Sequence, residues 1–258
     1  MNICVLIKQV PVITNIQMNP QNLSLERLST ESMLNPADVN ALEAALALKD
    51  IVGGEVTVFT MGNESSEVQI REALAMGANH AVRITDSAFS NADTLVTARV
   101  LAAAIRKNGE FDCIFCGENS LDSATGQIAG KLSALLSANL LTGVCQIDAD
   151  DQSITAHKKA GDGYEVWKSA YPVVCSIVEG SNKPRMATIR GRMAAKKVEI
   201  SILSNAELTL SEADLHSPSH VEAVFPAQKQ AAGGRINGKD DKDSAAKLAD
   251  ILAENHFI

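Results

Sequence analysis

The first half of the chain alternates short apolar runs with longer amphipathic segments. The apolar runs have the length and composition of buried strands, and they cover residues 2–10, 55–61, 78–84 and 111–116. Helix-like segments of ten or more residues follow them at 35–52, 64–76, 94–107 and 123–136. Because parallel strands need such crossover connections, the alternation predicts an α/β fold. We expect a doubly wound, mostly parallel sheet in a three-layer α/β/α arrangement.

The first predicted helix has clear boundary signals. Asn35 is expected at the N-cap, and Pro36 suits the first helical position, where its missing N–H is not needed. Gly53 and Gly54 end the helix. Its apolar face is formed by Val39, Leu42, Ala45 and Leu46.

After about residue 145 the pattern changes. Ser153–His157, Glu165–Ser169 and Pro172–Val178 are strand-like and closely spaced, which predicts antiparallel strands added to one edge of the sheet. From Glu207 onward the chain is polar, and it ends in an amphipathic helix, Ser244–Ala253. We therefore predict an α/β domain over residues 1–205 and an extended C-terminal arm over 206–258. The helix at the end of so long an arm is expected to pack on a partner chain.

Composition excludes some functions. The formal net charge is −8 and only 3% of the residues are aromatic, which disfavours nucleic-acid binding. The most apolar region, Leu132–Ile147, is interrupted by polar residues and is too short for membrane insertion. The N-terminal apolar run stops at Lys8 with no charged segment before it, so no secretion signal is expected and the protein is predicted to be cytoplasmic.

Five cysteines all lie in apolar runs. Cys113 and Cys116 have the spacing of a metal or redox pair, but on a strand residues three apart point to opposite faces. Buried, reduced thiols and no metal site are therefore expected. His216 and His220 form only a weak metal pair, because Pro218 separates them in a segment typical of a loop.

Familiar catalytic and nucleotide signatures are absent from the sequence. No GxGxxG follows the first strand, no GxxxxGK[ST] occurs, and no nucleophile–histidine–acid set is suggested. No catalytic residues are therefore assigned.

One segment, Gly117–Gly130, is typical of an anion site because it follows a strand at the carboxyl edge of the sheet. Asp122 or Ser123 is expected to cap the next helix, which leaves the amides of Ala124–Gln127 free to hold a phosphate. Thr125 and Gln127 lie beside these amides, and Gly126 allows close approach. The alternative is an ordinary capped helix start. Residues 34–38 form a second loop-to-helix junction that could flank the same nucleotide.

The basic segment, Asn182–Lys197, carries six cations and no acid in this acidic chain. Met186, Ile189 and Met193 lie between the cations, while Pro184 and Gly191 disfavour continuous regular structure. Apolar side chains in a cationic frame indicate a surface that docks on another molecule. A solvated charge run beside a core strand is the alternative.

Several motifs in order resemble the beta subunit of electron-transferring flavoproteins. They are KQVP at 8–11, NPADVNALEAAL at 35–46, TMG at 60–62, REALAMGA at 71–78 and RGRMAAKK at 190–197. The similarity continues weakly into the tail. At Gly117 the segment GENSLDSATGQIAG departs from the usual GRQAIDGDTAQVGP, with Glu118 in place of a cation. Here the chain is more similar to beta-type subunits of carnitine or nitrogen-fixation pathways.

The resemblance implies an adenine-nucleotide-binding fold, an alpha-subunit partner and an FAD that is shared with that subunit. It further implies AMP or a second FAD in the beta subunit's own site. The implied cofactor-binding residues are Leu6, Asn35, Pro36, Ala37, Asp38, Met61, Gly117, Asn119, Asp122, Ser123, Ala124, Thr125, Gly126, Gln127 and Ile128. The C-terminal helix is expected to pack on the alpha subunit.

The resemblance also implies a docking role for the basic segment. In this family the corresponding loop inserts one aliphatic side chain into a flavin dehydrogenase, such as an acyl-CoA dehydrogenase, and the aligned residue is Ile189. Arg185, Arg190 and Arg192 are the expected charged rim. The implied role is an electron carrier, passing electrons to a respiratory or ferredoxin-type acceptor, without substrate chemistry of its own.

Two alternatives remain. One is a nucleotide-binding regulatory protein of the universal-stress type, which would form homo-oligomers. The other is a subunit of a bifurcating flavoenzyme that oxidises NADH.

Overall fold

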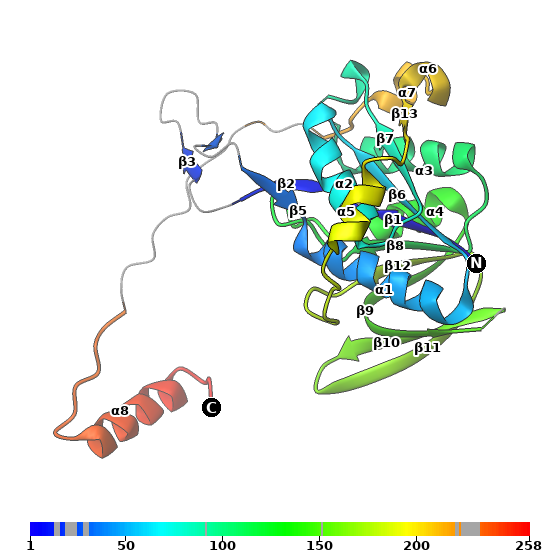
Figure 1. The fold of residues 1–258 in the computed structure, drawn as a ribbon. Coiled ribbons are helices and arrows are strands. Elements are labelled where there is room, and N and C mark those ends of the chain that lie inside the picture. The colour runs from blue at the N-terminus through cyan, green and yellow to red at the C-terminus, as the bar shows by residue number, and fades with distance from the viewer. Residues whose placement is uncertain are drawn as a thin grey trace. The chain divides into compact units, whose positions relative to one another are not determined.

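The structure is a computed structural model that describes residues 1–12, 16–18, 25–27, 31–90, 92–150, 152–219, 222 and 233–258. Residues 1–222 form one compact unit and residues 223–258 form a second. Figure 1 traces the chain. The helices α6 (Asn205–Leu208) and α7 (Glu212–Leu215) therefore belong to the first unit, together with the sheet.

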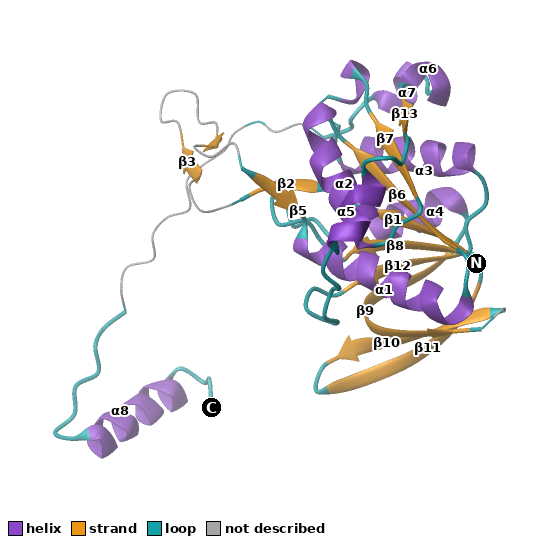
Figure 2. Ribbon diagram, viewed as in Figure 1, coloured by secondary structure: helices purple, strands orange, loops and turns teal. Residues whose placement is uncertain are grey.

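The first unit contains a nine-stranded sheet in the order β11-β10-β9-β12-β8-β1-β6-β7-β13 (Figure 2). Its strands are β1 (Asn2–Leu6), β6 (Glu55–Met61), β7 (His80–Ile84), β8 (Cys113–Gly117), β9 (Asn139–Ala149), β10 (Ser153–Ala160), β11 (Gly163–Ala170), β12 (Val173–Ile177) and β13 (Ile200–Leu203). All neighbours pair in parallel except β9 with β10 and β10 with β11. The predicted α/β class and mostly parallel sheet are confirmed.

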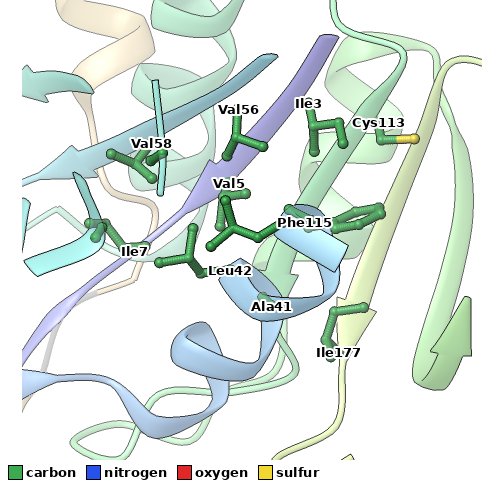
Figure 3. Close-up of a cluster of buried hydrophobic side chains, with 14 of the residues drawn as sticks. Ile3, Val5, Ile7, Ala41, Leu42, Val56, Val58, Cys113, Phe115 and Ile177 are labelled. Carbon is green, nitrogen blue, oxygen red and sulfur yellow. The ribbon is translucent and has the colours of Figure 1, made fainter. Parts of the chain in front are cut away.

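Helices cover both faces of the sheet. The longer ones are α1 (Pro36–Val52), α2 (Glu67–Met76), α3 (Thr94–Asn108) and α4 (Ile128–Leu136), with the shorter α5 (Ile189–Ala195) beside α2. Helices α1 and α2 pack on one face, over a core that includes Val5 and Phe115 (Figure 3). Helices α3 and α4 pack on the other, over Cys4 and Ile114. Strands buried on both faces explain the continuous apolar runs in the sequence.

The described part of the first unit also contains short 3₁₀ turns and two small two-stranded sheets. The turns are η2 (Glu64–Ser66), before α2, and η3 (Ser87–Phe89), before α3. Strand β2 (Gln9–Pro11) pairs with β5 (Ser32–Leu34), and β3 (Ile16–Met18) pairs with β4 (Leu25–Arg27), both antiparallel. The apolar run at 2–10 is thus two strands rather than one, because β1 ends at Leu6.

The prediction that Pro172–Val178 is an antiparallel edge strand is wrong. Strand β12 lies inside the sheet, parallel to both β8 and β9, and all its residues are buried. Strand β9, which was not predicted from the sequence, is inserted between β12 and the antiparallel pair. Strands β10 and β11 do form the predicted antiparallel edge.

The predicted helix start at residue 123 is also wrong. Helix α4 begins at Ile128, with Gln127 at the N-cap. Ala124 and Gly126 have φ values of 47° and 62°, in the left-handed region. A helix cannot run through such residues, so 121–127 form an exposed turn before α4 begins.

Four of the five cysteines are buried, as predicted, whereas Cys145 is half-buried. Cys113 lies in the core under α1 and Cys116 in the core under α3, so the two thiols point to opposite faces of β8. None of the five cysteines forms a disulfide, and burial raises the pKa of Cys113 to about 12. The described residues contain no group of three or more side chains suited to a metal. His220 lies outside the described residues, so its pairing with His216 is not tested.

The second unit contains one described helix, α8 (Asp241–Glu254), which confirms the predicted C-terminal helix. The Asp240 side chain caps it by accepting a hydrogen bond from the backbone N–H of Asp243. No residue of α8 is buried, and Leu248 and Ile251 are 45% and 43% exposed. Among the described helices, none combines the length and apolar character needed to span a bilayer.

We predict that Gly117→Ala destabilises the first unit. A Cβ at Gly117 would lie 2.6 Å from both the Cβ of Ala37 and Oδ1 of Asp38, at the start of α1. Overpacking of this kind lowers the free energy of unfolding by about 1–3 kcal/mol. Urea unfolding measures this change in the free energy of unfolding. Gly163→Ala is the control, because nothing lies within 4 Å of a Cβ at that position. Equal loss in both variants would contradict the prediction.

Candidate functional site

At the carboxyl ends of β1 and β8 the order in which successive strands are added to the sheet reverses. From β1 the chain proceeds through α1 to the adjacent β6, and later it crosses to β8 on the other side of β1. Open α/β sheets bind ligands in the crevice at such a switch point. The predicted nucleotide segments, residues 35–38 and 117–128, both start at this edge.

Asp38 joins the two strand ends to α1. Its carboxylate accepts hydrogen bonds from the backbone N–H of Lys8 at 2.9 Å and from that of Gly117 at 2.9 Å. Lys8 follows β1, Gly117 ends β8, and Asp38 lies in the first turn of α1. One buried side chain therefore fixes three elements at the switch point.

Burial raises the pKa of Asp38 to about 7, although hydrogen bonds from Asn35, Gly117 and Lys8 act in the opposite direction. Folding therefore disfavours the charged form of Asp38, because the surrounding donors only partly compensate for the lost water.

Asn35 occupies the predicted N-cap position, but its side chain does not cap α1. Its Nδ2 donates to the carbonyl oxygen of Asn119 at 2.9 Å, and its Oδ1 accepts from the N–H of Leu121 at 3.0 Å. The side chain thus ties the start of α1 to the loop after β8.

Lys8 holds the same loop through its charge. Its Nζ lies 2.8 Å from Oδ1 of Asp122, and Ser120 accepts a weaker bond at 3.5 Å. Burial alone would raise the pKa of Asp122, but Lys8 and Ser120 lower it below its usual value. Lys8 was not among the predicted site residues; its place directly after the first strand is the signal that could have identified it.

The exposed turn between Asp122 and α4 offers free backbone donors. Among the described residues, the N–H groups of Thr125, Gly126 and Gln127 have no acceptor, whereas that of Ala124 donates to Ser120. Three of the four amides named in the sequence analysis are therefore free, but they lie in the turn before α4 and not in its first turn. The positive end of α4 begins directly after them.

Gln127 is held in place from the side of α3. Its Oε1 accepts hydrogen bonds from Oγ1 of Thr94 at 2.7 Å and from Nζ of Lys131 at 2.8 Å. Lys131 also donates to Thr94. The side chain that was predicted to touch a ligand is therefore already engaged within the protein.

The remaining predicted residues lie around this edge in different settings. Leu6 is buried at the end of β1. Met61 ends β6, the neighbour of β1, and is half-buried. The structure therefore brings residues 35–38 and 117–122 into direct contact, and it does not join Met61 or Thr125 to them by a hydrogen bond in the described part of the chain.

The basic segment is partly helical, contrary to the expected loop. Residues 182–188 are irregular, and α5 begins at Ile189, where Thr188 caps it through the N–H of Gly191. Met186, Ile189 and Met193 are 89%, 83% and 64% exposed. Figure 1 shows α5 (yellow) beside α2 (cyan).

The three arginines of the predicted rim have different surroundings. Arg185 forms ion pairs with Glu43 and Asp50 of α1, both at 2.9 Å, and its hydrogen bond to Glu43 raises its pKa. The guanidinium groups of Arg190 and Arg192 make no ion pair or hydrogen bond among the described residues. Their charge is available at the surface.

Two hollows lie elsewhere in the first unit. A cavity of about 340 Å³ opens at the amino ends of the strands, where Glu55, His80 and Glu199 line it. A groove of about 700 Å³ runs between α2 and α5, with Val68, Arg71 and Arg192 among its walls. The groove therefore borders the basic segment.

We predict that Asp38→Asn lowers stability in a pH-dependent way. Because the pKa of Asp38 in the folded protein is about 7, against about 4 when unfolded, folding favours its protonated form. The stabilising contribution is then largest below about pH 4 and falls as the pH rises to about 7. The asparagine side chain does not titrate, so the difference in unfolding free energy between wild type and variant should be larger at pH 5 than at pH 8.

Chemical denaturation at both pH values measures this difference. Asp162→Asn is the control, since Asp162 lies in an exposed turn and makes no hydrogen bond among the described residues. An unchanged difference between pH 5 and pH 8 would show that Asp38 has an ordinary pKa.

Comparison with known proteins gives a consistent assignment. The model of the electron transfer flavoprotein domain matches residues 22–208. The electron transfer flavoprotein subunit beta of Thermoanaerobacterium thermosaccharolyticum is 36% identical, with all of both chains covered. The caffeyl-CoA reductase-Etf complex subunit CarD of Acetobacterium woodii is 35% identical, also over the full length of both.

A further relative has a different name. Protein FixA of Azorhizobium caulinodans is 34% identical over 98% of this chain and 94% of its own. The identities to these three relatives are nearly equal. From the matched domain and these full-length similarities, the chain belongs to the electron transfer flavoprotein family, among its beta subunits.

Proposed function

We propose that this chain pairs with an alpha subunit and carries electrons from a flavin dehydrogenase to a respiratory or ferredoxin-type acceptor. The flavin of such a heterodimer supplies the redox chemistry, and the protein supplies binding and orientation. This agrees with a sequence in which no catalytic set was found. The observation that carries the proposal is the switch-point junction, where Asp38 joins β1, β8 and α1 beside three free amides.

An adenine nucleotide, AMP or a second FAD, is the proposed ligand of that junction. Free amides of Thr125, Gly126 and Gln127 are suited to a phosphate, because backbone N–H groups at the start of a helix stabilise negative charge. Gly126 leaves the backbone open, since a Cβ there would meet only the carbonyl of Glu118, at 3.4 Å. The proposed nucleotide contacts are the fifteen residues that the family resemblance implies.

The C-terminal arm is the proposed attachment to the alpha subunit. Helix α8 has a partly exposed apolar stripe and no buried residue of its own. Phe257 and Ile258 extend this apolar character, at 76% and 77% exposed. Such a surface is typical of a segment that packs on a partner.

The basic segment is the proposed docking site for the dehydrogenase. Ile189 is its anchor, and Arg190 and Arg192 form the available part of the charged rim. Cations at the rim of an interface raise the rate of encounter more than the final affinity. The partner surface is therefore expected to be acidic around an apolar pocket.

Size and colour of the purified protein test the heterodimer. Expressed with its alpha subunit, the chain should elute as a yellow one-to-one complex. A homo-oligomer formed by the chain alone, without affinity for an alpha subunit, would instead favour the universal-stress alternative. Bleaching of the complex by NADH under anaerobic conditions would indicate a bifurcating enzyme.

We predict that Ile189→Ala weakens docking without loss of nucleotide. Removing an aliphatic anchor weakens association by about 1–3 kcal/mol. Electron transfer from a purified acyl-CoA dehydrogenase to the heterodimer measures this as a raised KM. Val166→Ala is the matched control, because Val166 is 62% exposed on β11, the edge strand of the sheet, and lies on none of the helices that border the basic segment. Equal KM values for both variants would refute the anchor role.

A further inference from the structure

Glu43 is an unusual residue for the middle of α1. It is only 9% exposed, and in a helix of 17 residues it lies two turns from the N-terminus. A buried carboxylate is unfavourable unless charged or polar partners replace its water. Its partners therefore show why the helix tolerates it.

Among the described residues, the side-chain partners of Glu43 all come from one residue of the basic segment. The backbone N–H of Arg185 donates to Oε2 at 2.8 Å. The guanidinium adds Nε at 2.9 Å to Oε2 and Nη2 at 3.0 Å to Oε1. This two-pronged arrangement fixes both the side chain and the main chain of Arg185. Asp50, whose side chain is 59% exposed, supplies a second and weaker contact to the same guanidinium.

A second buried side chain of α1 holds the chain just before Arg185. Asn40 accepts a hydrogen bond from the N–H of Gly180 at 3.0 Å and donates to the carbonyl of Asn182 at 3.0 Å. Asn182 returns a bond to the carbonyl of Asn40 at 2.9 Å. Residues 180–185 are therefore fastened to α1 at both ends.

Helix α2 holds the basic segment a second time, after the exposed residues. Arg71 of α2 donates to the carbonyls of Ala195 and Val198, both at 2.6 Å. Gly191 approaches the carbonyl of Ala75 so closely that a Cβ would clash with it. Met186 and Ile189 thus project from a short stretch between two fixed ends.

A docking residue binds more tightly when its loop is already ordered, because less conformational entropy is lost on association. We propose that Glu43 is a positioning residue, which fixes residues 182–188 through Arg185 and so sets how Ile189 is presented to a partner protein. Arg185 is then an anchor of the segment rather than part of its exposed rim. The inference rests on the proposed docking function only for its effect on the partner.

Amide hydrogen exchange in the full-length chain, paired with its alpha subunit, tests whether Glu43 holds residues 182–188 against α1. This measurement needs no dehydrogenase. Glu43→Gln keeps the size of the side chain and removes its charge. Exchange of residues 182–188 should then be about tenfold faster, as expected when charge-assisted hydrogen bonds are lost. Arg185→Lys, which retains the charge but not the two-pronged geometry, should change exchange in the same direction. The control is Glu110→Gln, a carboxylate without a side-chain partner among the described residues.

Unchanged exchange of residues 182–188 in Glu43→Gln would overturn the proposal. So would faster exchange spread equally over α1 and the loop after β8, because that pattern indicates general destabilisation. An increase confined to 182–188 supports it.

Kinetics with the acyl-CoA dehydrogenase test the consequence. Glu43→Gln should raise KM for the heterodimer about fivefold with kcat unchanged, and add little in an Ile189→Ala background. An equal rise in both backgrounds would contradict positioning through Ile189. If the wild-type complex receives no electrons from the dehydrogenase, the docking proposal fails, while the exchange result still decides the role of Glu43.

Discussion

Three buried polar side chains of α1 hold three loops against the core of this protein. Asp38 binds the backbone after β1 and at the end of β8, Asn40 binds the turn after β12, and Glu43 binds Arg185. Each replaces lost water with backbone or guanidinium donors, which is the condition for burying a polar group. The apolar face of the same helix packs on the sheet, so one helix joins the core to three loops.

This arrangement relates the two proposed sites. The proposed nucleotide junction lies at the first turn of α1, and Asn40, Glu43 and Asp50 fasten the basic segment over about the next three turns of the same helix. A rigid helix between them keeps their separation constant. For an electron carrier this matters, because the distance between a bound flavin and a docked partner depends on such a frame.

The sequence predicted the strands and helices of the parallel half well, because buried strands and amphipathic helices have different apolar periods. It misplaced the start of α4, since Asp122 and Ser123 are good caps while nothing in the sequence reveals that Ala124 adopts a left-handed conformation. The sequence analysis also misplaced β12. The position of β12 depends on β9, and the apolar run of β9 was not distinguished from the helix and loop before it.

The candidate site was predictable only in outline. Residues 35–38 and 117–128 could be identified from strand ends and from family motifs. The roles of Lys8 and Glu43 could not, because each depends on contacts with residues far away in the chain: Lys8 with Asp122, and Glu43 with Arg185. A glutamate within a helix normally indicates a solvated position, and only the fold shows that this one is buried.

The nucleotide released on denaturing the purified heterodimer tests the central claim most directly. Chromatography of the released material, with absorbance to count each species, gives both identity and stoichiometry. The account predicts one FAD together with either AMP or a second FAD for each heterodimer. A single FAD with no adenine nucleotide from the beta subunit would contradict a nucleotide site at the Asp38 junction.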